Sequence, residues 1–548
     1  MESAKHAGDA AVAVSKAYGV ETMFTLSGGH VFPLYDGAVH EGMRILDVRH
    51  EQSAVFAAEA TARLTRKPGL AVLTAGPGIT NGVSGVATAH FNGSPVVVMG
   101  GRAPRSRWGS GALQEMDHPP LLGPITKLAF TATGADSIGQ DVEMAFRTAV
   151  APHRGPVFLD YYMDDLFAAS PEHHVETQSP SPLEPDPDSL RAIARLLAEA
   201  ERPVLVYGSD VWMDRAEEAA RDFAENWRLP VIPNGQGRGI LPAGHELLVT
   251  RARGQAFAQA DLVIVVGTPL DFRLGYGWFG GKQGAAPAKV VHIADAPSQL
   301  STHAETVASA AGDLSVVLWG LGTACGDAGV KPTAYADWLS RLSQAAAKAI
   351  ADDAGLLAAD SDPIHPMRIY GELAKVLADD AVVIGDGGDF VSYAGKYVEP
   401  KQPGNWLDPG PYGCLGTGLG YAMAARLARP SSQVVLLLGD GAAGFSLMDA
   451  DSLVRHGLPV VMICGNNGIW GLEKHPMQML YGYDVAAELQ PQCRYDQVVT
   501  ALGGGGELVT QPSEIGPALR RAFDSGVPYM VNIATDPQVA YPRATSGI

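Results

Sequence analysis

The sequence predicts an α/β protein made of three doubly wound domains, each with a parallel sheet covered by helices. The chain has 548 residues, which corresponds to about three domains at roughly 150 residues each. Short apolar runs alternate with Ala-rich helical stretches along most of its length. Such continuous apolar runs are typical of parallel strands that are buried on both faces.

The apolar runs fall into three groups, and each group predicts the strands of one sheet. The first comprises 70–74, 95–99 and 157–160, the second 203–207, 262–266 and 290–293, and the third 381–384, 434–438, 460–464 and 529–533. No short-period repeat is visible, and the sequence leaves open whether the first and third groups are structural duplicates.

Two stretches separate the groups. Residues 166–189 carry five prolines among Ser, Asp and Glu, a composition that resists helix and strand. Residues 325–366 hold a polar, Ala-rich helical segment and then a cluster of helix breakers. The predicted domains are therefore 1–165, 190–325 and 366–536, followed by a tail at 537–548.

Composition excludes several classes of protein. Hydrophobic residues make up 46% of the chain, so disorder is not expected, and a net charge of −19 makes nucleic acid a poor partner. The four cysteines have no paired spacing, which predicts neither disulfides nor a zinc site. We expect no signal peptide and no membrane span, because the N-terminus is charged and no apolar run reaches eighteen residues. A cytoplasmic protein fits this composition.

The third group carries the most specific pattern. Strand 434–438 ends in Gly439-Asp440-Gly441, and strand 460–464 ends in Gly465-Asn466-Asn467. The carboxyl ends of parallel strands meet at one sheet edge, where ligands bind. Carboxylate and amide oxygens suit a hard cation such as Mg²⁺. Each motif alone is a common turn or loop, and their combination favours a metal-bridged phosphate site.

At this point the chain resembles the thiamine-diphosphate enzymes, whose cofactor motif begins with GDG and ends with NN. The resemblance implies that Asp440, Asn467 and the backbone carbonyl of Ile469 bind Mg²⁺. The diphosphate would lie on the loop and helix start that follow the strand, at Gly439, Gly441, Ala442 and Ala443.

Two further loops of the third domain are similar to that family. Residues 385–390 resemble its second diphosphate loop, which implies contacts from Gly388, Asp389 and Phe390. Leu415 stands where the family places a bulky apolar residue beneath the cofactor. A dinucleotide fingerprint at 416–420 is excluded, because Tyr421 replaces the third glycine and no strand leads into it.

The first domain is expected to supply the acid that activates the cofactor. By chemistry alone, Glu51 is a first-turn glutamate favoured by a helix dipole. By resemblance, it binds the pyrimidine nitrogen and shares a proton with it, and Thr74, Pro77 and Asn81 belong to the pyrimidine-binding loop. In this family one subunit holds the pyrimidine and another the diphosphate. The resemblance therefore implies a homo-oligomer, with a dimer as the minimal active unit and a tetramer as the expected form.

The reaction is less strongly specified. The resemblance points to the branch with acetolactate synthases, oxalyl-CoA decarboxylases and 2-hydroxyacyl-CoA lyases. Residues 468–475, GIWGLEKH, depart from the synthase pattern. We therefore expect a lyase that cleaves a 2-hydroxyacyl-CoA to formyl-CoA and an aldehyde or ketone. The alternatives are acetolactate-synthase-like condensation of 2-keto acids and oxalyl-CoA decarboxylation.

A lyase needs a base near the 2-hydroxyl group. The candidates around the substrate are His30 as base, with Gln114 and Gln492 as orienting groups, and each has a purely structural alternative. Tyr541 and Arg543 of the tail are candidates for a lid over the thioester, although a frayed terminus explains them equally. Lys396 and Lys401 are candidates for CoA phosphates.

Overall fold

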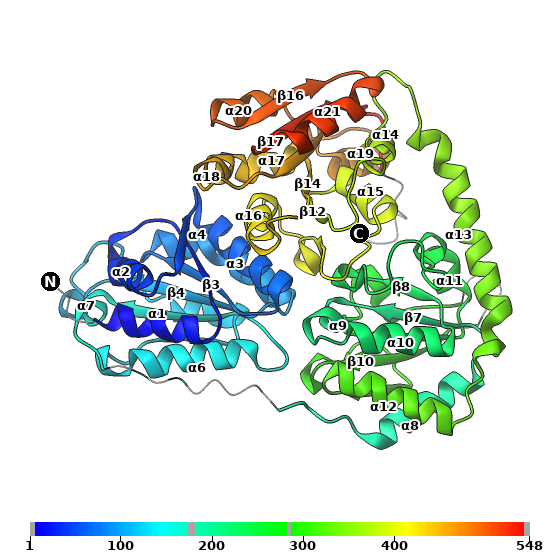
Figure 1. The fold of residues 1–548 in the computed structure, drawn as a ribbon, viewed down its shortest axis with the longest axis horizontal. Helices are drawn as coiled ribbons and strands as arrows, with labels where there is room; N and C mark the ends of the chain where they lie inside the picture. The colour runs from blue at the N-terminus through cyan, green and yellow to red at the C-terminus, as the bar shows by residue number, and fades with distance from the viewer. Residues whose placement is uncertain (1–5, 172, 174, 176–180, 282–285, 542–548) are drawn as a thin grey trace.

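A computed structural model shows three α/β lobes joined by long connections (Figure 1). It describes residues 6–171, 173, 175, 181–281 and 286–541. The first lobe is drawn in blue and cyan, the middle lobe in green, and the third lobe in yellow to red.

The sheet of the first lobe has six parallel strands in the order β2-β1-β3-β4-β6-β5. These strands are Thr22–Thr25 (β1), Arg44–Asp47 (β2), Gly69–Leu73 (β3), Val96–Arg102 (β4), Leu128–Thr131 (β5) and Val157–Tyr162 (β6). One face packs on Ala7–Ala17 (α1), Phe32–His40 (α2) and Ile138–Val150 (α6), and the other on Glu51–Thr65 (α3) and Pro77–Phe91 (α4). Short helices at Pro119–Leu122 (α5) and Met163–Phe167 (α7) complete the lobe.

The middle lobe has a five-stranded parallel sheet in the order β11-β10-β9-β7-β8. Its strands are Pro203–Tyr207 (β7), Val231–Pro233 (β8), Leu262–Val266 (β9), Lys289–Ala294 (β10) and Ala308–Ala311 (β11). Its helices are Pro187–Glu199 (α8), Ser209–Met213 (α9), Glu217–Trp227 (α10), Arg253–Gln259 (α11) and Leu314–Asp327 (α12). The long helix Ala336–Leu357 (α13) then runs along the edge of the molecule to the third lobe (Figure 1).

The third lobe repeats the topology of the first, because its strands follow the order β13-β12-β14-β15-β17-β16. They are Val382–Asp386 (β12), Trp406–Leu407 (β13), Val434–Gly439 (β14), Val461–Asn466 (β15), Gly505–Val509 (β16) and Tyr529–Ala534 (β17). The helices are Pro366–Leu373 (α14), Asp389–Tyr397 (α15), Gly418–Ala428 (α16), Asp440–Ser446 (α17), Ala450–Arg455 (α18), Gly471–Tyr481 (α19), Tyr495–Ala501 (α20) and Pro512–Asp524 (α21). The equal strand orders answer the question that the sequence left open, since both sheets are wound in the same way.

The predicted fold class is confirmed. Every predicted strand is present, and its observed ends differ from the predicted ends by at most three residues. Seven strands were not predicted, namely β1, β2, β5, β8, β11, β13 and β16. Six of these lie at a sheet edge. Four of these edge strands, β2, β5, β11 and β16, are only partly buried. The other two, β8 and β13, are buried but span only three and two residues, which is too short to stand out as an apolar run. The Pro-rich stretch also ends sooner than expected, because Asp186 caps α8 and Pro187 occupies its first turn.

The first and third lobes share one apolar core between their sheets, with α3 packed on α16. A buried polar cluster lies at this junction. The Glu59 carboxylate accepts hydrogen bonds from Tyr421 and from Asn92 Nδ2 at 2.8 Å, and Arg63 Nη1 lies 3.5 Å from it. Because Arg63 also donates to Gln236 at 3.3 Å, the cluster connects all three lobes.

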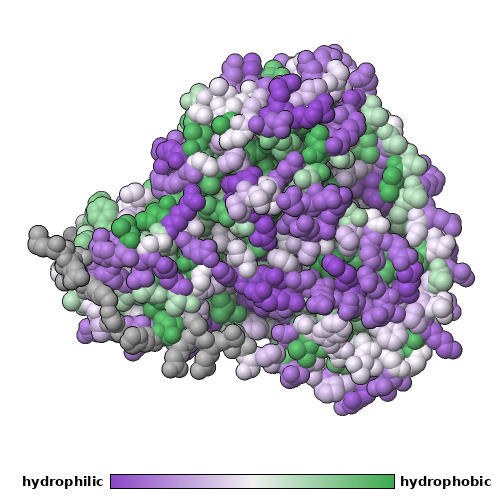
Figure 2. Space-filling view, viewed as in Figure 1, coloured by the Kyte–Doolittle hydropathy of each residue, from purple (hydrophilic) through white to green (hydrophobic). Residues whose placement is uncertain are grey.

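The face shown in Figure 2 is mainly hydrophilic, with smaller groups of apolar side chains. Among the helices of the described residues, none combines the length and apolar character needed to cross a membrane.

Candidate active site

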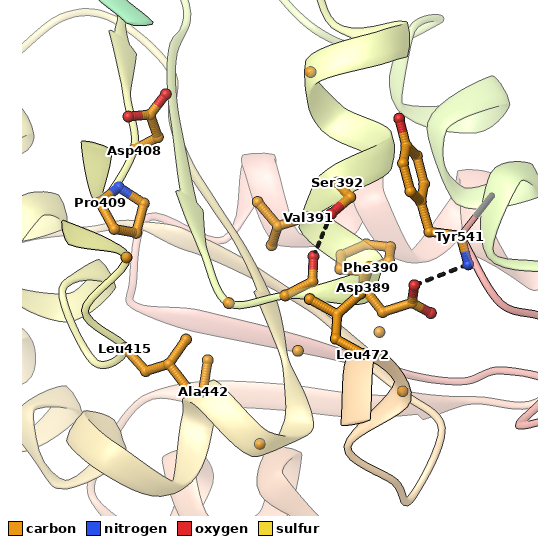
Figure 3. A pocket seen from close by; sticks show the side chains of 18 of the residues that line it. Asp389, Phe390, Val391, Ser392, Asp408, Pro409, Leu415, Ala442, Leu472 and Tyr541 are labelled. Carbon is orange, nitrogen blue, oxygen red and sulfur yellow. Dashed lines mark hydrogen bonds between the residues drawn. The ribbon is translucent and has the colours of Figure 1, made fainter. Parts of the chain in front are cut away.

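A cavity of about 780 Å³ lies at the carboxyl ends of β12, β14 and β15, where two of the sequence motifs meet. Ten predicted cofactor residues line it: Gly388, Asp389, Phe390, Leu415, Gly439, Asp440, Gly441, Ala442, Asn467 and Ile469. Figure 3 shows Leu415 and Ala442 on one side of this space, with Asp389, Phe390 and Leu472 on the other. Ala443, the remaining prediction in this lobe, is fully buried one residue further along α17.

The two loops that follow β14 and β15 are tied together by Asp440. Its Oδ2 accepts the N–H of Gly468 at 2.7 Å, and its Oδ1 accepts the N–H of Gly441 at 3.1 Å. Burial raises the pKa of Asp440 to about 6, and the two N–H groups oppose this rise. Asn467 Oδ1 accepts the N–H of Ile469 at 3.2 Å. Carboxylate and amide oxygens therefore stand at one sheet edge, which is the donor chemistry that Mg²⁺ prefers.

The space beside these oxygens fits a bound phosphate group. A Cβ added to Gly439 would meet no atom within 4 Å, whereas one on Gly441 would lie 2.4 Å from the ring of Trp470. Only glycine fits at position 441, and the backbone at Gly439 faces open space. The open space at Gly439 leaves main-chain groups accessible to an anion at the start of α17, whereas Trp470 covers Gly441.

Asp386 positions the loop that carries Leu415. This fully buried carboxylate accepts the N–H of Gly416 at 3.0 Å and that of Gly418 at 2.8 Å. Burial raises its pKa to about 7, against the effect of the two N–H groups. The hydrogen bonds hold the backbone that directly follows Leu415, and the Leu415 side chain lines the cavity.

The C-terminal tail reaches this cavity through Tyr541. Its N–H donates to Asp389 Oδ1 at 2.9 Å, as the dashed line in Figure 3 shows, and its ring packs edge-on against Tyr393 at 4.8 Å. The predicted lid is thus in contact with the site as far as Tyr541, whereas Arg543 lies outside the described residues.

A second group of predicted residues lies at the carboxyl edge of the first sheet. Glu51 begins α3 and is 7% exposed, and its Oε2 accepts a hydrogen bond from Asn81 Nδ2 at 3.0 Å. Gly78, the residue after Pro77, lies close to both Thr74 and Glu51. If it carried a Cβ atom, that atom would lie 2.7 Å from the Thr74 side chain and 3.7 Å from Glu51 Oε1. The predicted pyrimidine-binding residues therefore form one cluster around the start of α4.

His30 and Gln114 adjoin the same cluster. His30 Nδ1 lies 3.2 Å from Thr74 Oγ1, and burial lowers the pKa of His30. Gln114 packs directly against Gly76, because a Cβ atom added to Gly76 would lie 3.0 Å from Gln114. The lowered pKa keeps the imidazole neutral near pH 7, which is the form that accepts a proton.

Within a single chain, the first-lobe cluster is not part of the cavity, whose lining comes from the middle and third lobes. The two edges are nevertheless in contact. The Arg49 N–H donates to Asp449 Oδ1 at 2.7 Å, and a Cβ atom added to Gly416 would lie 3.1 Å from the side-chain nitrogen of Gln52. The structure thus groups the predicted residues into two half-sites rather than one complete site.

Gln492 lies apart from both groups. It is exposed and has a left-handed backbone with φ of 51°. The preceding residue, Pro491, packs on Gly468, which directly follows Asn467. A Cβ atom added to Gly468 would lie 3.3 Å from the Cα atom of Pro491. The assignment of Gln492 to the substrate therefore stays a prediction.

A second cavity, of about 520 Å³, has a cationic lining made by Arg238, Arg251, Arg253 and Lys396, against Asp352 and Asp353. It shares Asn234, Arg238, Ser392, Gly395 and Tyr541 with the first cavity. Burial, together with the neighbouring Arg238 and Arg273, lowers the pKa of Arg253 to about 10, so it remains cationic at neutral pH. Lys401 is not part of this lining and pairs with Asp379.

Arg238 lines both cavities. It belongs to the Arg and Lys residues of the middle domain that we expect as candidates for the CoA phosphates, but no motif singles it out among them. Its Nη2 donates to the Gly395 carbonyl at 2.9 Å, and its guanidinium lies 4.8 Å above the Trp406 ring. Its Nη1 is buried without a hydrogen-bond partner among the described residues. These cationic residues are dispersed over 159 positions, from 238 to 396, so no local motif marks them.

Comparison with known proteins finds three family models, one for each lobe. Residues 5–121 match the N-terminal binding domain of thiamine pyrophosphate enzymes, residues 190–321 the central domain, and residues 386–533 the C-terminal binding domain.

Two kinds of relative are similar over nearly the whole chain. An acetolactate synthase large subunit of Mycobacterium tuberculosis and a probable acetolactate synthase of Mycobacterium bovis are each 50% identical over 545 residues, covering 99% of this chain and 98% of theirs. A 2-hydroxyacyl-CoA lyase 2 of Caenorhabditis elegans is 32% identical over 553 residues, covering 93% of this chain and 85% of its own.

Proposed function

Because the chain belongs to the thiamine pyrophosphate enzymes and has all three of their domains, we propose that it cleaves the carbon–carbon bond of a 2-hydroxyacyl-CoA. The products would be formyl-CoA and an aldehyde or ketone, and the reverse condensation would use the same groups. The observation that carries this proposal is the cationic cavity that opens onto the cofactor cavity through Arg238.

The cationic cavity suits a long, polyanionic substrate. Arginine binds phosphate oxygens with two parallel hydrogen bonds. Arg238 Nη1 is buried without a hydrogen bond and lies 3.8 Å from Glu399 Oε2, its ion-pair partner. A CoA thioester extending from the cofactor would place its phosphates among Arg238, Arg251 and Arg253, while a small 2-keto acid would leave that space unused.

Asp440, Asn467 and the Ile469 carbonyl are proposed to hold Mg²⁺, whose positive charge would offset the negative charge of the cofactor diphosphate. When bound, thiamine diphosphate supplies an electron sink next to the reacting carbonyl. Leu415 would hold the cofactor bent, with Asp386 fixing its loop. Glu51 would share a proton with the pyrimidine nitrogen at Oε1 or Oε2.

His30 is the proposed base for the 2-hydroxyl proton. Burial lowers the pKa of His30 beside Thr74, so the imidazole is unprotonated near neutral pH and available to accept a proton, although it is a weaker base than a free imidazole. Gln114 would orient the same hydroxyl group. Glu51 and His30 belong to the first half-site, and we propose that the first half-site of one subunit faces the cofactor cavity of another in a dimer.

The acetolactate synthase reaction is a second candidate, because relatives that are 50% identical carry that name. The test supplies the purified protein with thiamine diphosphate and Mg²⁺ and offers 2-hydroxyacyl-CoA, oxalyl-CoA or pyruvate separately. The proposal expects formyl-CoA and a carbonyl product from the first substrate. Turnover of pyruvate alone would establish the synthase, and carbon dioxide release from oxalyl-CoA alone would establish the decarboxylase.

A further inference from the structure

A third cavity, of about 680 Å³, lies between the first lobe and the middle sheet, and Arg273 lines both this cavity and the cofactor cavity. It opens at the carboxyl ends of β7, β9 and β10, where Ser209, Gly267 and Ala294 line it. The chain crosses over between β7 and β9 in this sheet, which is where doubly wound sheets place ligands.

Three side chains with metal-binding atoms meet beside this cavity. His153 comes from the first lobe, and Asp210 and Asp295 come from the middle lobe. One ligand atom of each lies within 4.8 Å of the other two. His153 Nδ1 is 2.9 Å from both carboxylate oxygens of Asp295. Two ligand atoms of one tetrahedral zinc ion lie about 3.2–3.5 Å apart, so closure around an ion requires the more distant ligand atoms to move together by up to about 1.5 Å.

The environment of the Asp210 carboxylate indicates that a ligand binds here. It is 9% exposed and lines the cavity. Its backbone N–H donates to the Gly267 carbonyl, but its carboxylate has neither a hydrogen bond nor an ion pair with any residue that the structure describes. A buried carboxylate of this kind is costly unless a cation or a proton compensates it.

The cationic side chains around Asp210 have other partners. Arg154 Nη1 lies 2.6 Å from Asp214 and 3.8 Å from Asp295. Lys127 donates to the Ala151 carbonyl at 2.7 Å, and Arg273 pairs with Asp271. Asp210 therefore faces an excess of negative charge, shared with Asp295 and only partly offset by His153.

We propose that His153, Asp210 and Asp295 bind a divalent transition-metal cation of the zinc class, distinct from the Mg²⁺ of the cofactor site. One imidazole and two carboxylates are ligands that zinc accepts, and a fourth position would face the cavity. Because His153 belongs to one lobe and both aspartates to another, the cation would tie the first lobe to the middle lobe.

The test uses the full-length protein, saturated with thiamine diphosphate and excess Mg²⁺ and then dialysed against micromolar zinc chloride. Metal and cofactor contents per chain are measured by mass spectrometry and by cofactor assay. We expect about one zinc ion per chain in addition to the magnesium, and a higher midpoint of thermal unfolding with zinc than without it.

The matched variants are Asp210→Asn and Asp271→Asn, both at carboxylates that line the same cavity. Asp210→Asn should weaken zinc binding at least about a hundredfold, with unchanged magnesium and cofactor content. Asp271→Asn should bind zinc as the wild type does, because Asp271 pairs with Arg273. The proposal is overturned if the wild type takes up no zinc, or if Asp210→Asn binds zinc with unchanged affinity.

Discussion

Asn81 donates a hydrogen bond to Glu51 across 3.0 Å, and this contact joins the start of α3 to the first turns of α4. Glu51, which we predicted from the sequence to be the activating acid, is therefore held in place by Asn81, which we predicted to bind the pyrimidine with it. The contact fixes one oxygen and leaves the other available for a proton shared with a ligand.

Replacing Glu51 with Gln should lower kcat by about a hundredfold or more, because an amide cannot share the activating proton. The variant should keep the contact with Asn81 and unfold at the wild-type denaturant midpoint. The matched control is Glu21→Gln, at an exposed carboxylate paired only with Lys67, which should be fully active. Near-normal turnover by Glu51→Gln would remove Glu51 from its assigned role.

Two inactive variants should restore activity when their subunits are mixed. We assume that each site combines Glu51 of one subunit with Asp440 of the other. A dimer of one Glu51→Gln chain and one Asp440→Asn chain then has one site with both substitutions and one site with neither. Random reassortment then gives about a quarter of wild-type activity, as expected for twofold symmetry. The measurement is turnover after co-refolding of equal amounts. If both half-sites belong to one chain, the mixture stays inactive.

Asp440→Asn should weaken Mg²⁺-dependent cofactor binding by about a hundredfold, since a charged ligand is lost. Trp470 lines the same cavity, so quenching of its fluorescence reports binding during a titration with thiamine diphosphate. Asp451→Asn on α18, whose side chain pairs with Arg455, serves as the control and should bind normally. Equal affinities in the two variants would contradict the assignment of Asp440 as a metal ligand.

Asp386→Ala should destabilise the third lobe and disturb Leu415. The substitution leaves the N–H groups of Gly416 and Gly418 buried without an acceptor, which costs about 1–3 kcal/mol for each group. Urea unfolding measures the loss, and the cofactor affinity of the folded protein reports the loop. Asp386→Asn keeps one acceptor and should lose less. A wild-type unfolding midpoint for Asp386→Ala would show that the loop is held by other contacts.

Arg238→Ala should raise KM for a 2-hydroxyacyl-CoA about tenfold or more, with a small effect on kcat, because a charged hydrogen bond to phosphate contributes about 1.5–3 kcal/mol. Arg238→Lys should recover part of the loss. Lys401→Ala, outside the cationic cavity, is the control and should leave KM unchanged. An unchanged KM in Arg238→Ala would place the CoA phosphates elsewhere.

The sequence by itself determined the fold class and every inner strand of the three sheets except β1. Strands such as Leu262–Val266 are buried on both faces and must be apolar throughout, so their composition marks them. It also located Asp440 and Asn467, because two strand ends in one parallel sheet necessarily open onto the same edge. The contact of Asp440 with Gly468 follows from that rule.

Other features depend on contacts between distant segments, which no local pattern records. The edge strand Gly505–Val509 is held by its pairing with β17 rather than by its own composition. Only the tertiary structure brought Arg238 next to Lys396, and His153 next to Asp210 and Asp295. It also showed Glu51 and Asp440 in separate half-sites. Backbone periodicity fixes elements one at a time, whereas cavities form where side chains from several lobes meet.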